Sequence, residues 1–128
     1  MGLFKNMFGG SDESEKESRM AWRELTDLGQ LNEIVNESTE KPVVIFKHST
    51  RCSISRMALR QFEQEFSLEG KVVPYYLDLL EHRDISNEIA NRFGVYHQSP
   101  QLIVIKDGKA IYDRSHESID ATKLVDFI

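Results

Sequence analysis

The segment VVIF at residues 43–46 does most to limit the folds open to this chain. A continuous apolar run after Pro42 is typical of a strand that is buried on both faces of a sheet. Such strands occur mainly in α/β proteins, where helices cover both sides of the sheet. The segment therefore predicts a central strand with helices packed on either side.

Strand and helix patterns alternate around this segment. Residues 21–25 form a candidate strand, and apolar residues at helical spacing follow it, with Thr26 or Asp27 as the expected cap. After Cys52, an apolar stripe with the same spacing predicts a second helix. Its members are Ile54, Met57, Ala58, Phe62 and Phe66.

The second half of the chain continues the alternation. Residues 71–79 predict a strand, and a short helix follows that ends at Gly94. Residues 102–112 read as a β-hairpin, and Ser118 is the expected cap of a last helix. The order β-α-β-α-β-α-β-β-α favours parallel pairing early and an antiparallel end. We therefore predict a thioredoxin-like fold, with a mixed central sheet of four to five strands flanked by helices.

The chain has 128 residues and is 40% hydrophobic, which suits one domain with a modest core. Residues 1–20 contain Gly9-Gly10 and a Ser/Glu-rich stretch that is too polar to bury anything. We expect residues 1–20 to be a disordered N-terminal tail and residues 21–128 to be the folded domain.

Charge and hydropathy exclude several classes of partner. The net charge is -5 and the chain has no stripe of lysine and arginine, so nucleic acid is not an expected partner. No apolar run approaches the roughly 20 residues of a membrane span, and no secretory leader pattern is present. The sequence predicts a cytoplasmic protein without stable membrane association, and a monomer, because no heptad pattern is evident.

The chain has one cysteine, Cys52, which excludes an internal disulfide and any site that needs two thiolates from one chain. Cys52 lies between a predicted buried strand and a predicted helix. Free backbone N–H groups and the positive end of the helix dipole favour the thiolate at such a place. Arg51 adds a positive charge beside it, so we expect a reactive thiol rather than an inert buried one.

Ser55 lies three residues after Cys52, where a dithiol oxidoreductase has its second cysteine, so a resolving thiol is absent. Its hydroxyl could stabilise the thiolate or cap the helix, or Ser55 could simply be a small residue that fits the first turn. Together with Arg51 and Ser53, it completes the groups expected to stabilise the Cys52 thiolate.

Ser99 and Pro100 directly precede the predicted strand over residues 102–105. Only about 5–6% of X–Pro bonds are cis in general, but a proline at this place in thioredoxin-like folds is cis and faces the reactive cysteine. We expect Ser99, Pro100, Thr50 and Gln98 to contact the substrate.

No metal site is predicted, because the histidines lack metal-ligand spacing. His48 could be a neighbour of the thiolate or an ordinary residue at a strand end. The four histidines are His48, His82, His97 and His116.

Two segments, KHSTRCSISRMALRQFEQ and FGVYHQSPQLIVIKDGK, resemble the YtxJ-type monothiol bacilliredoxin family of low-GC Gram-positive bacteria. The likeness covers residues 20–128. The family has a thioredoxin-like fold with one active cysteine in a Thr-Cys-Pro-Ile-Ser type of motif. This chain differs at two positions, because Arg51 separates Thr50 from Cys52 and Ser53 stands in place of the proline.

The resemblance implies that the protein removes bacillithiol from bacillithiolated client proteins after oxidative stress. The Cys52 thiolate would attack the bacillithiol sulfur, release the client thiol and keep bacillithiol as a mixed disulfide. Bacillithiol is then a co-substrate, no cofactor is bound, and free bacillithiol or another oxidoreductase completes the cycle.

Three other hypotheses for the function remain open. The first is an iron–sulfur carrier of the monothiol glutaredoxin type, although the chain lacks the Cys-Gly-Phe-Ser pattern of those proteins. The second is a thioredoxin-like adaptor without catalysis. The third is a thiol peroxidase, suggested by Ser49, but Ile45 stands where those enzymes need a proline.

Overall fold

A computed structural model describes residues 20–128, and the tail predicted over residues 1–20 lies outside them except for Met20. The Met20 side chain is buried in the core. The elements are β1 (Arg23–Glu24), α2 (Gln30–Glu37), β2 (Val43–His48), α3 (Ser53–Glu65), β3 (Val73–Asp78), α4 (Arg83–Phe93), β4 (Gln101–Lys106), β5 (Lys109–Ser115) and the 3-10 segments η1 (His116–Ser118) and η2 (Ala121–Phe127).

The strands form one five-stranded mixed sheet in the order β1-β3-β2-β4-β5. β3 is parallel to both β1 and β2, whereas β4 is antiparallel to β2 and to β5. The predicted mixed sheet, with parallel pairing in the first half and a hairpin at the end, is confirmed. β2 lies in the middle of the sheet, as expected from its continuous apolar sequence.

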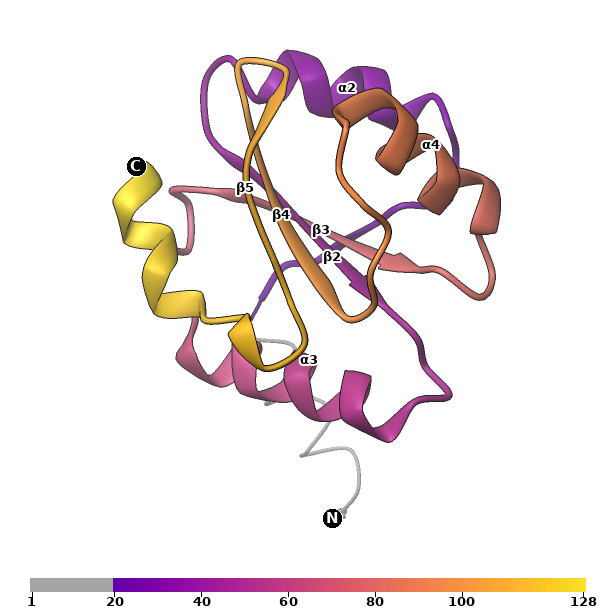
Figure 1. Cartoon of the computed structure of the whole chain (residues 1–128). Coiled ribbons are helices and arrows are strands. Elements are labelled where there is room, and N and C mark those ends of the chain that lie inside the picture. Colours follow the sequence, from indigo (N-terminus) through magenta and orange to yellow (C-terminus); the bar gives the residue numbers. More distant parts are fainter. Residues whose placement is uncertain (1–19) are drawn as a thin grey trace, which may run out of the picture.

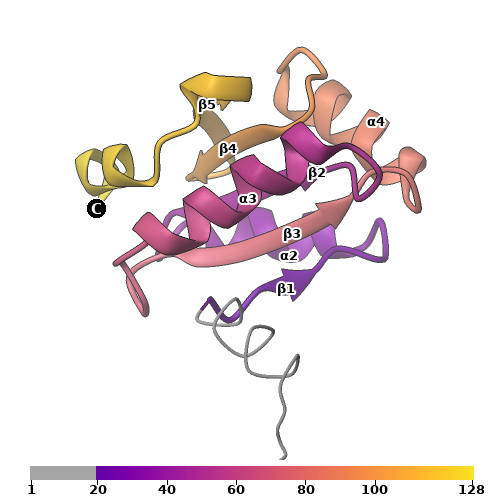
Figure 2. The same ribbon diagram turned by 90° about the horizontal axis from the view of Figure 1, so that it is seen from below.

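Helices cover both faces of the sheet, with α2 and α4 on one face and α3 on the other (Figures 1 and 2). Successive side chains of β2 alternate between these faces because a strand has a period of two. Val43 and Ile45 pack with Leu31 of α2 and other side chains of that face. Val44 and Phe46 pack on the opposite face, in the cluster that contains Phe62 of α3 and Leu124 of η2.

Several predicted boundaries differ from the structure. β1 has two residues rather than five, and β3 covers Val73–Asp78 rather than residues 71–79. α2 begins at Gln30, and its N-cap is Gly29 rather than Thr26 or Asp27. The reason is a turn ahead of the helix, in which the Asp27 carboxylate accepts from the Gly29 N–H and Gln30 Oε1 accepts from the N–H groups of Thr26 and Asp27.

The prediction that Ser118 caps a final helix is wrong. Ser118 ends η1, and the cap of η2 is Asp120, whose carboxylate accepts from the Thr122 N–H. Both segments are 3-10 helices. η2 still buries Ala121 and Leu124 against the α3 face of the sheet, whereas η1 buries no residue.

Candidate active site at the end of the central strand

The sheet register brings three chain segments to one edge. β2 ends at His48, and His48 is the partner of Asp78 at the end of parallel β3. Lys47 is the partner of Gln101, the first residue of antiparallel β4. The segment between β2 and α3, which contains Cys52, therefore lies at the same edge as the segment between α4 and β4, which contains Ser99 and Pro100 (Figure 1).

Cys52 is the N-cap residue of α3, as its sequence position predicts. Its backbone is extended, with φ -101° and ψ 121°, and its side chain is exposed. The backbone is held on both sides, because the Cys52 N–H donates to the Ser49 carbonyl and the Arg56 N–H donates to the Cys52 carbonyl. The sulfur is thus placed in solvent at the positive end of a 13-residue helix, where an anion is stabilised.

Ser55 is fully buried and joins the end of β2 to the first turn of α3. Its Oγ accepts from the Ser49 N–H at 3.0 Å and lies 2.8 Å from His48 Nδ1. Within the described chain, no hydrogen bond links Ser55 to the Cys52 sulfur. The hydroxyl fixes the turn that carries Cys52, and direct contact with the thiolate stays a prediction.

His48, which the sequence left as either a neighbour of the thiolate or a strand-end residue, is the last residue of β2 and is buried. Burial lowers the pKa of His48, and the nearby Asp78 carboxylate partly opposes this shift. The imidazole ring also lies 5.6 Å from the Tyr76 ring, measured between centroids. His48 therefore serves as the neutral partner that holds Ser55.

Thr50, Arg51 and Ser53 surround Cys52 in sequence and are exposed. The Thr50 carbonyl accepts from Arg56 Nη1 at 3.0 Å, so this arginine ties the loop to α3. Sequence reasoning missed Arg56. Its place four residues after Cys52, one helical turn along α3, was the available signal.

The Ser99–Pro100 peptide bond is cis, as predicted. The Pro100 carbonyl accepts from the His116 N–H, which ties the start of β4 to the end of β5. Ser99 Oγ is buried and has no hydrogen-bond partner within residues 20–128. Gln98 is exposed, and its N–H is directed back toward Gln101 Oε1 at 3.4 Å.

Lys47, which follows the apolar run over residues 43–46, is a fully buried residue of β2. Its Nζ lies 2.8 Å from His97 Nδ1. Burial lowers the pKa of Lys47 to about 8, and burial, followed by the charge of Lys47, lowers the pKa of His97. The ammonium group is therefore the donor and the neutral imidazole is the acceptor at neutral pH.

The lowered pKa of Lys47 predicts a pH-dependent stability. Unfolded Lys47 keeps its proton up to about pH 10.5, whereas the folded protein releases it near pH 8, so the unfolded state binds more protons between these values. The free energy of unfolding of wild type relative to Lys47→Met should rise from pH 8 to 10.5, by at most about 3 kcal/mol. Denaturant titrations at several pH values measure it, and a flat difference would contradict a charged, buried Lys47.

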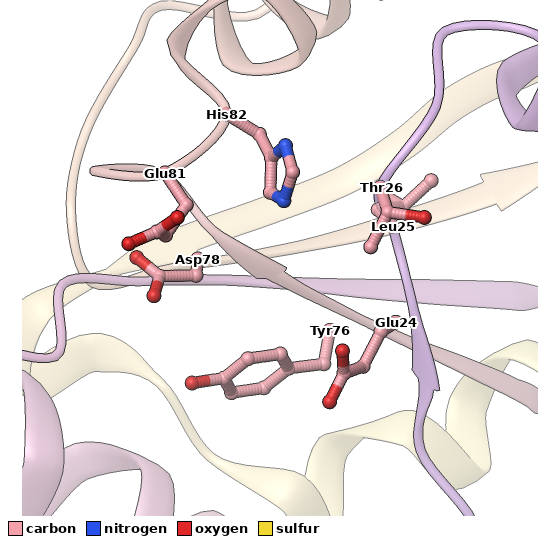
Figure 3. A pocket seen from close by; sticks show the side chains of 7 residues that line it. All are labelled: Glu24, Leu25, Thr26, Tyr76, Asp78, Glu81 and His82. Carbon is pink, nitrogen blue, oxygen red and sulfur yellow. The ribbon is translucent and has the colours of Figure 1, made fainter.

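A hollow of about 300 Å³ lies at the ends of β1 and β3 (Figure 3). Three carboxylates give it a negative character, and burial, helped by the Asp78 charge, raises the pKa of Tyr76 to about 12. Its lining residues are Glu24, Leu25, Thr26, Tyr76, Asp78, Glu81 and His82.

In the described part of the chain, no group of three or more histidine, cysteine or acidic side chains could hold a metal ion. No helix among the same residues is long and apolar enough to cross a membrane.

The chain is similar to a known protein family and to several solved structures. The family model described as monothiol bacilliredoxin BrxC matches residues 23–124. A solved structure described as an oxidoreductase with a thioredoxin fold is 33% identical, with TM-score 0.70, and the match covers 80% of this chain and 89% of that one. Thioredoxin from Malassezia sympodialis is 23% identical, with TM-score 0.65 and coverage of 84% and 88%. Fasciola hepatica thioredoxin is 22% identical, with TM-score 0.62 and coverage of 81% and 93%. The predicted thioredoxin-like fold is confirmed.

Proposed function

Because this chain belongs to the monothiol bacilliredoxin family, as its sequence resemblance predicted, we propose that it removes bacillithiol from bacillithiolated client proteins. The chain is a thiol–disulfide oxidoreductase of the monothiol type. The observation that supports the proposal most is the exposed Cys52 at the N-terminus of α3, with a buried serine where a resolving thiol would stand. We also place the reaction in the cytoplasm, as the sequence predicts.

The proposed reaction needs one thiolate. Cys52 attacks the bacillithiol sulfur of the client's mixed disulfide, and a new disulfide forms between Cys52 and bacillithiol as the old one breaks. The client cysteine leaves as a thiolate and takes a proton from solvent. The number of disulfides is unchanged, so no external oxidant or reductant enters this step. Free bacillithiol or another oxidoreductase then reduces the mixed disulfide on Cys52.

We assign the neighbouring residues to two tasks. Arg51 and Ser53, the exposed neighbours of Cys52 in sequence, are assigned to stabilise the negative charge of its sulfur, together with the free N–H groups of the first turn of α3. The client contacts are Thr50, Gln98, Ser99 and Pro100. Ser55 acts through the turn, because its hydroxyl is engaged with Ser49 and His48.

Intact mass spectrometry tests this function directly. The purified protein is mixed with a client protein that carries bacillithiol, and both masses are followed, with Cys52→Ala as the control. We expect the bacillithiol mass to move from the client to Cys52. If the mass stays on the client while Cys52 alkylates readily, the mixed-disulfide partner is another thiol. If Cys52 also resists alkylation, the non-catalytic adaptor takes precedence, whereas a brown dimer with visible absorption would support an iron–sulfur carrier.

A cysteine at position 55 should convert the protein to a dithiol enzyme. Positions 52 and 55 lie within one helical turn, at a Cα separation that a disulfide can bridge. We expect Ser55→Cys to release bacillithiol after transfer and to accumulate an internal disulfide, visible by intact mass. Loss of the hydrogen bonds to Ser49 and His48 should lower the free energy of unfolding by about 1–3 kcal/mol.

The matched control for this prediction is Ser53→Cys. That position is exposed and adjacent to Cys52, where the two sulfurs do not face each other across a helical turn. It should keep the bacillithiol adduct. If Ser55→Cys also retains only the mixed disulfide, the two side chains do not approach each other in the way that the helix geometry requires.

A further inference from the structure

Two buried polar side chains, Lys47 and Gln101, interrupt the apolar face of the sheet beneath α4. On the same face, the neighbouring pair farther from the active-site edge is apolar and consists of Ile45 of β2 and its partner Ile103 of β4. The next pair toward the active-site edge is Lys47 and Gln101, and both side chains are buried. The change from apolar to polar therefore coincides with the edge that carries Cys52 and Pro100.

Both members of this pair bind the same loop. The Lys47 ammonium donates to His97 Nδ1 at 2.8 Å, and Ser86 Oγ of α4 lies 3.2 Å from the same nitrogen. Gln101 Nε2 donates to the Tyr96 carbonyl at 2.9 Å, and its Oε1 faces the Gln98 N–H at 3.4 Å. Three consecutive residues, 96–98, are thus held from the protein interior.

The outer side of this loop faces solvent. Tyr96 is 90% exposed, and Gln98 is also exposed. The loop leads without interruption into Ser99 and the cis proline. The loop thus presents an exposed side at the edge of the sheet that carries Cys52, while its inner side is fixed by Lys47 and Gln101.

We propose that Lys47 is a positioning residue for the exchange reaction, which binds His97 and so holds the client-facing loop 96–98 in place beside Cys52. This inference rests on the proposed function. A methionine would fit beside Ile45 and Ile103 without burying a charge, so lysine stands here at a cost to folding. What lysine adds is a donor that reaches His97 from the middle of the sheet.

Three variants separate this role from general stability. Lys47→Met removes the donor and keeps an unbranched side chain of similar length. His97→Leu removes the acceptor, whereas His97→Asn retains one, because Asn Oδ1 stands at the same number of bonds from Cα as His Nδ1. Lys106→Met, an exposed lysine at the opposite end of β4, is the matched control.

Exchange is measured with two mixed-disulfide peptides, one that carries bacillithiol and one that carries glutathione. We expect Lys47→Met and His97→Leu to raise KM roughly tenfold while kcat is retained, because the loop is misplaced but the nucleophile is not. His97→Asn and Lys106→Met should stay near the wild-type value. The double variant Lys47→Met/His97→Leu should be no worse than either single variant, since both break one contact.

Two further measurements, alkylation of Cys52 and hydrogen exchange at Gln98, distinguish a misplaced loop from a damaged fold. Iodoacetamide should alkylate Cys52 at the wild-type rate in Lys47→Met, and the Gln98 amide hydrogen should exchange faster. An unchanged KM, or an equal loss of exchange and alkylation, would overturn the positioning role. If wild type exchanges only with the glutathione peptide and Lys47→Met raises that KM, the proposed function fails while the inference stands.

Discussion

Cys52→Ser reduces thiol exchange to the uncatalysed rate. A serine hydroxyl does not ionise near neutral pH and cannot replace the thiolate as a nucleophile. The chain has no second cysteine that could take over the reaction. We therefore expect a loss of several orders of magnitude in the rate of transfer, which is the usual consequence of removing a nucleophile.

The measurement is the second-order rate constant for release of the client thiol from its bacillithiol mixed disulfide. Arg51→Ala and Ser53→Ala serve as companions, because they alter the surroundings of the sulfur and leave it in place. We expect these two variants to slow the reaction far less than Cys52→Ser. Residual transfer by Cys52→Ser at the wild-type rate would show that another group performs the chemistry.

Phe62→Ala should lower the free energy of unfolding by about 3–5 kcal/mol. Phe62 is 1% exposed and lies between α3 and the sheet. Its ring centroid is 5.4 Å from that of Phe46, 6.0 Å from that of Trp22 and 6.0 Å from that of Phe66. Truncation leaves a cavity at the centre of this aromatic cluster, and it removes the one buried apolar side chain of α3.

Urea unfolding of wild type and variant gives this free energy, and Met57→Ala on the same helix is the control. Met57 is 68% exposed, so its truncation should change stability by less than about 0.5 kcal/mol. Equal losses for the two variants would falsify the packing described for α3. Because Phe62 does not contact the reacting atoms, folded Phe62→Ala should still alkylate at Cys52.

The fold could be predicted largely from local patterns, because its central elements carry strong ones. Val43–Phe46 are buried on both faces, and the predicted helix after Cys52 is α3. Of the apolar stripe predicted for it, Phe62 is buried in α3 and Phe66 is buried just after it, whereas Ile54 and Met57 are exposed. The ends of elements were less predictable, since they depend on side-chain hydrogen bonds between neighbours in space. Gln30, for instance, folds back onto the Thr26 and Asp27 N–H groups and delays the start of α2.

The candidate site likewise has features that the sequence predicts and one that it does not. Cys52 at the start of α3 and the cis bond before Pro100 follow from their places in the order of elements. The bond between Lys47 and His97 spans 50 residues and depends on the register of β2 against β4, which no local pattern specifies. Lys47 alternates with Val43 and Ile45, and this period-two placement was the one clue that it points inward.

The central position of β2 has a consequence for how the protein fluctuates. β2 is paired along both of its edges, whereas β1 has two residues and forms one border of the sheet. Amide hydrogens of β2 should therefore exchange with solvent deuterium only through global opening, while those of β1 exchange through local fraying. The loop that carries Cys52 directly follows β2 and is therefore joined to a slowly exchanging strand. Partial opening at the borders of the sheet should thus leave the reactive sulfur in its place.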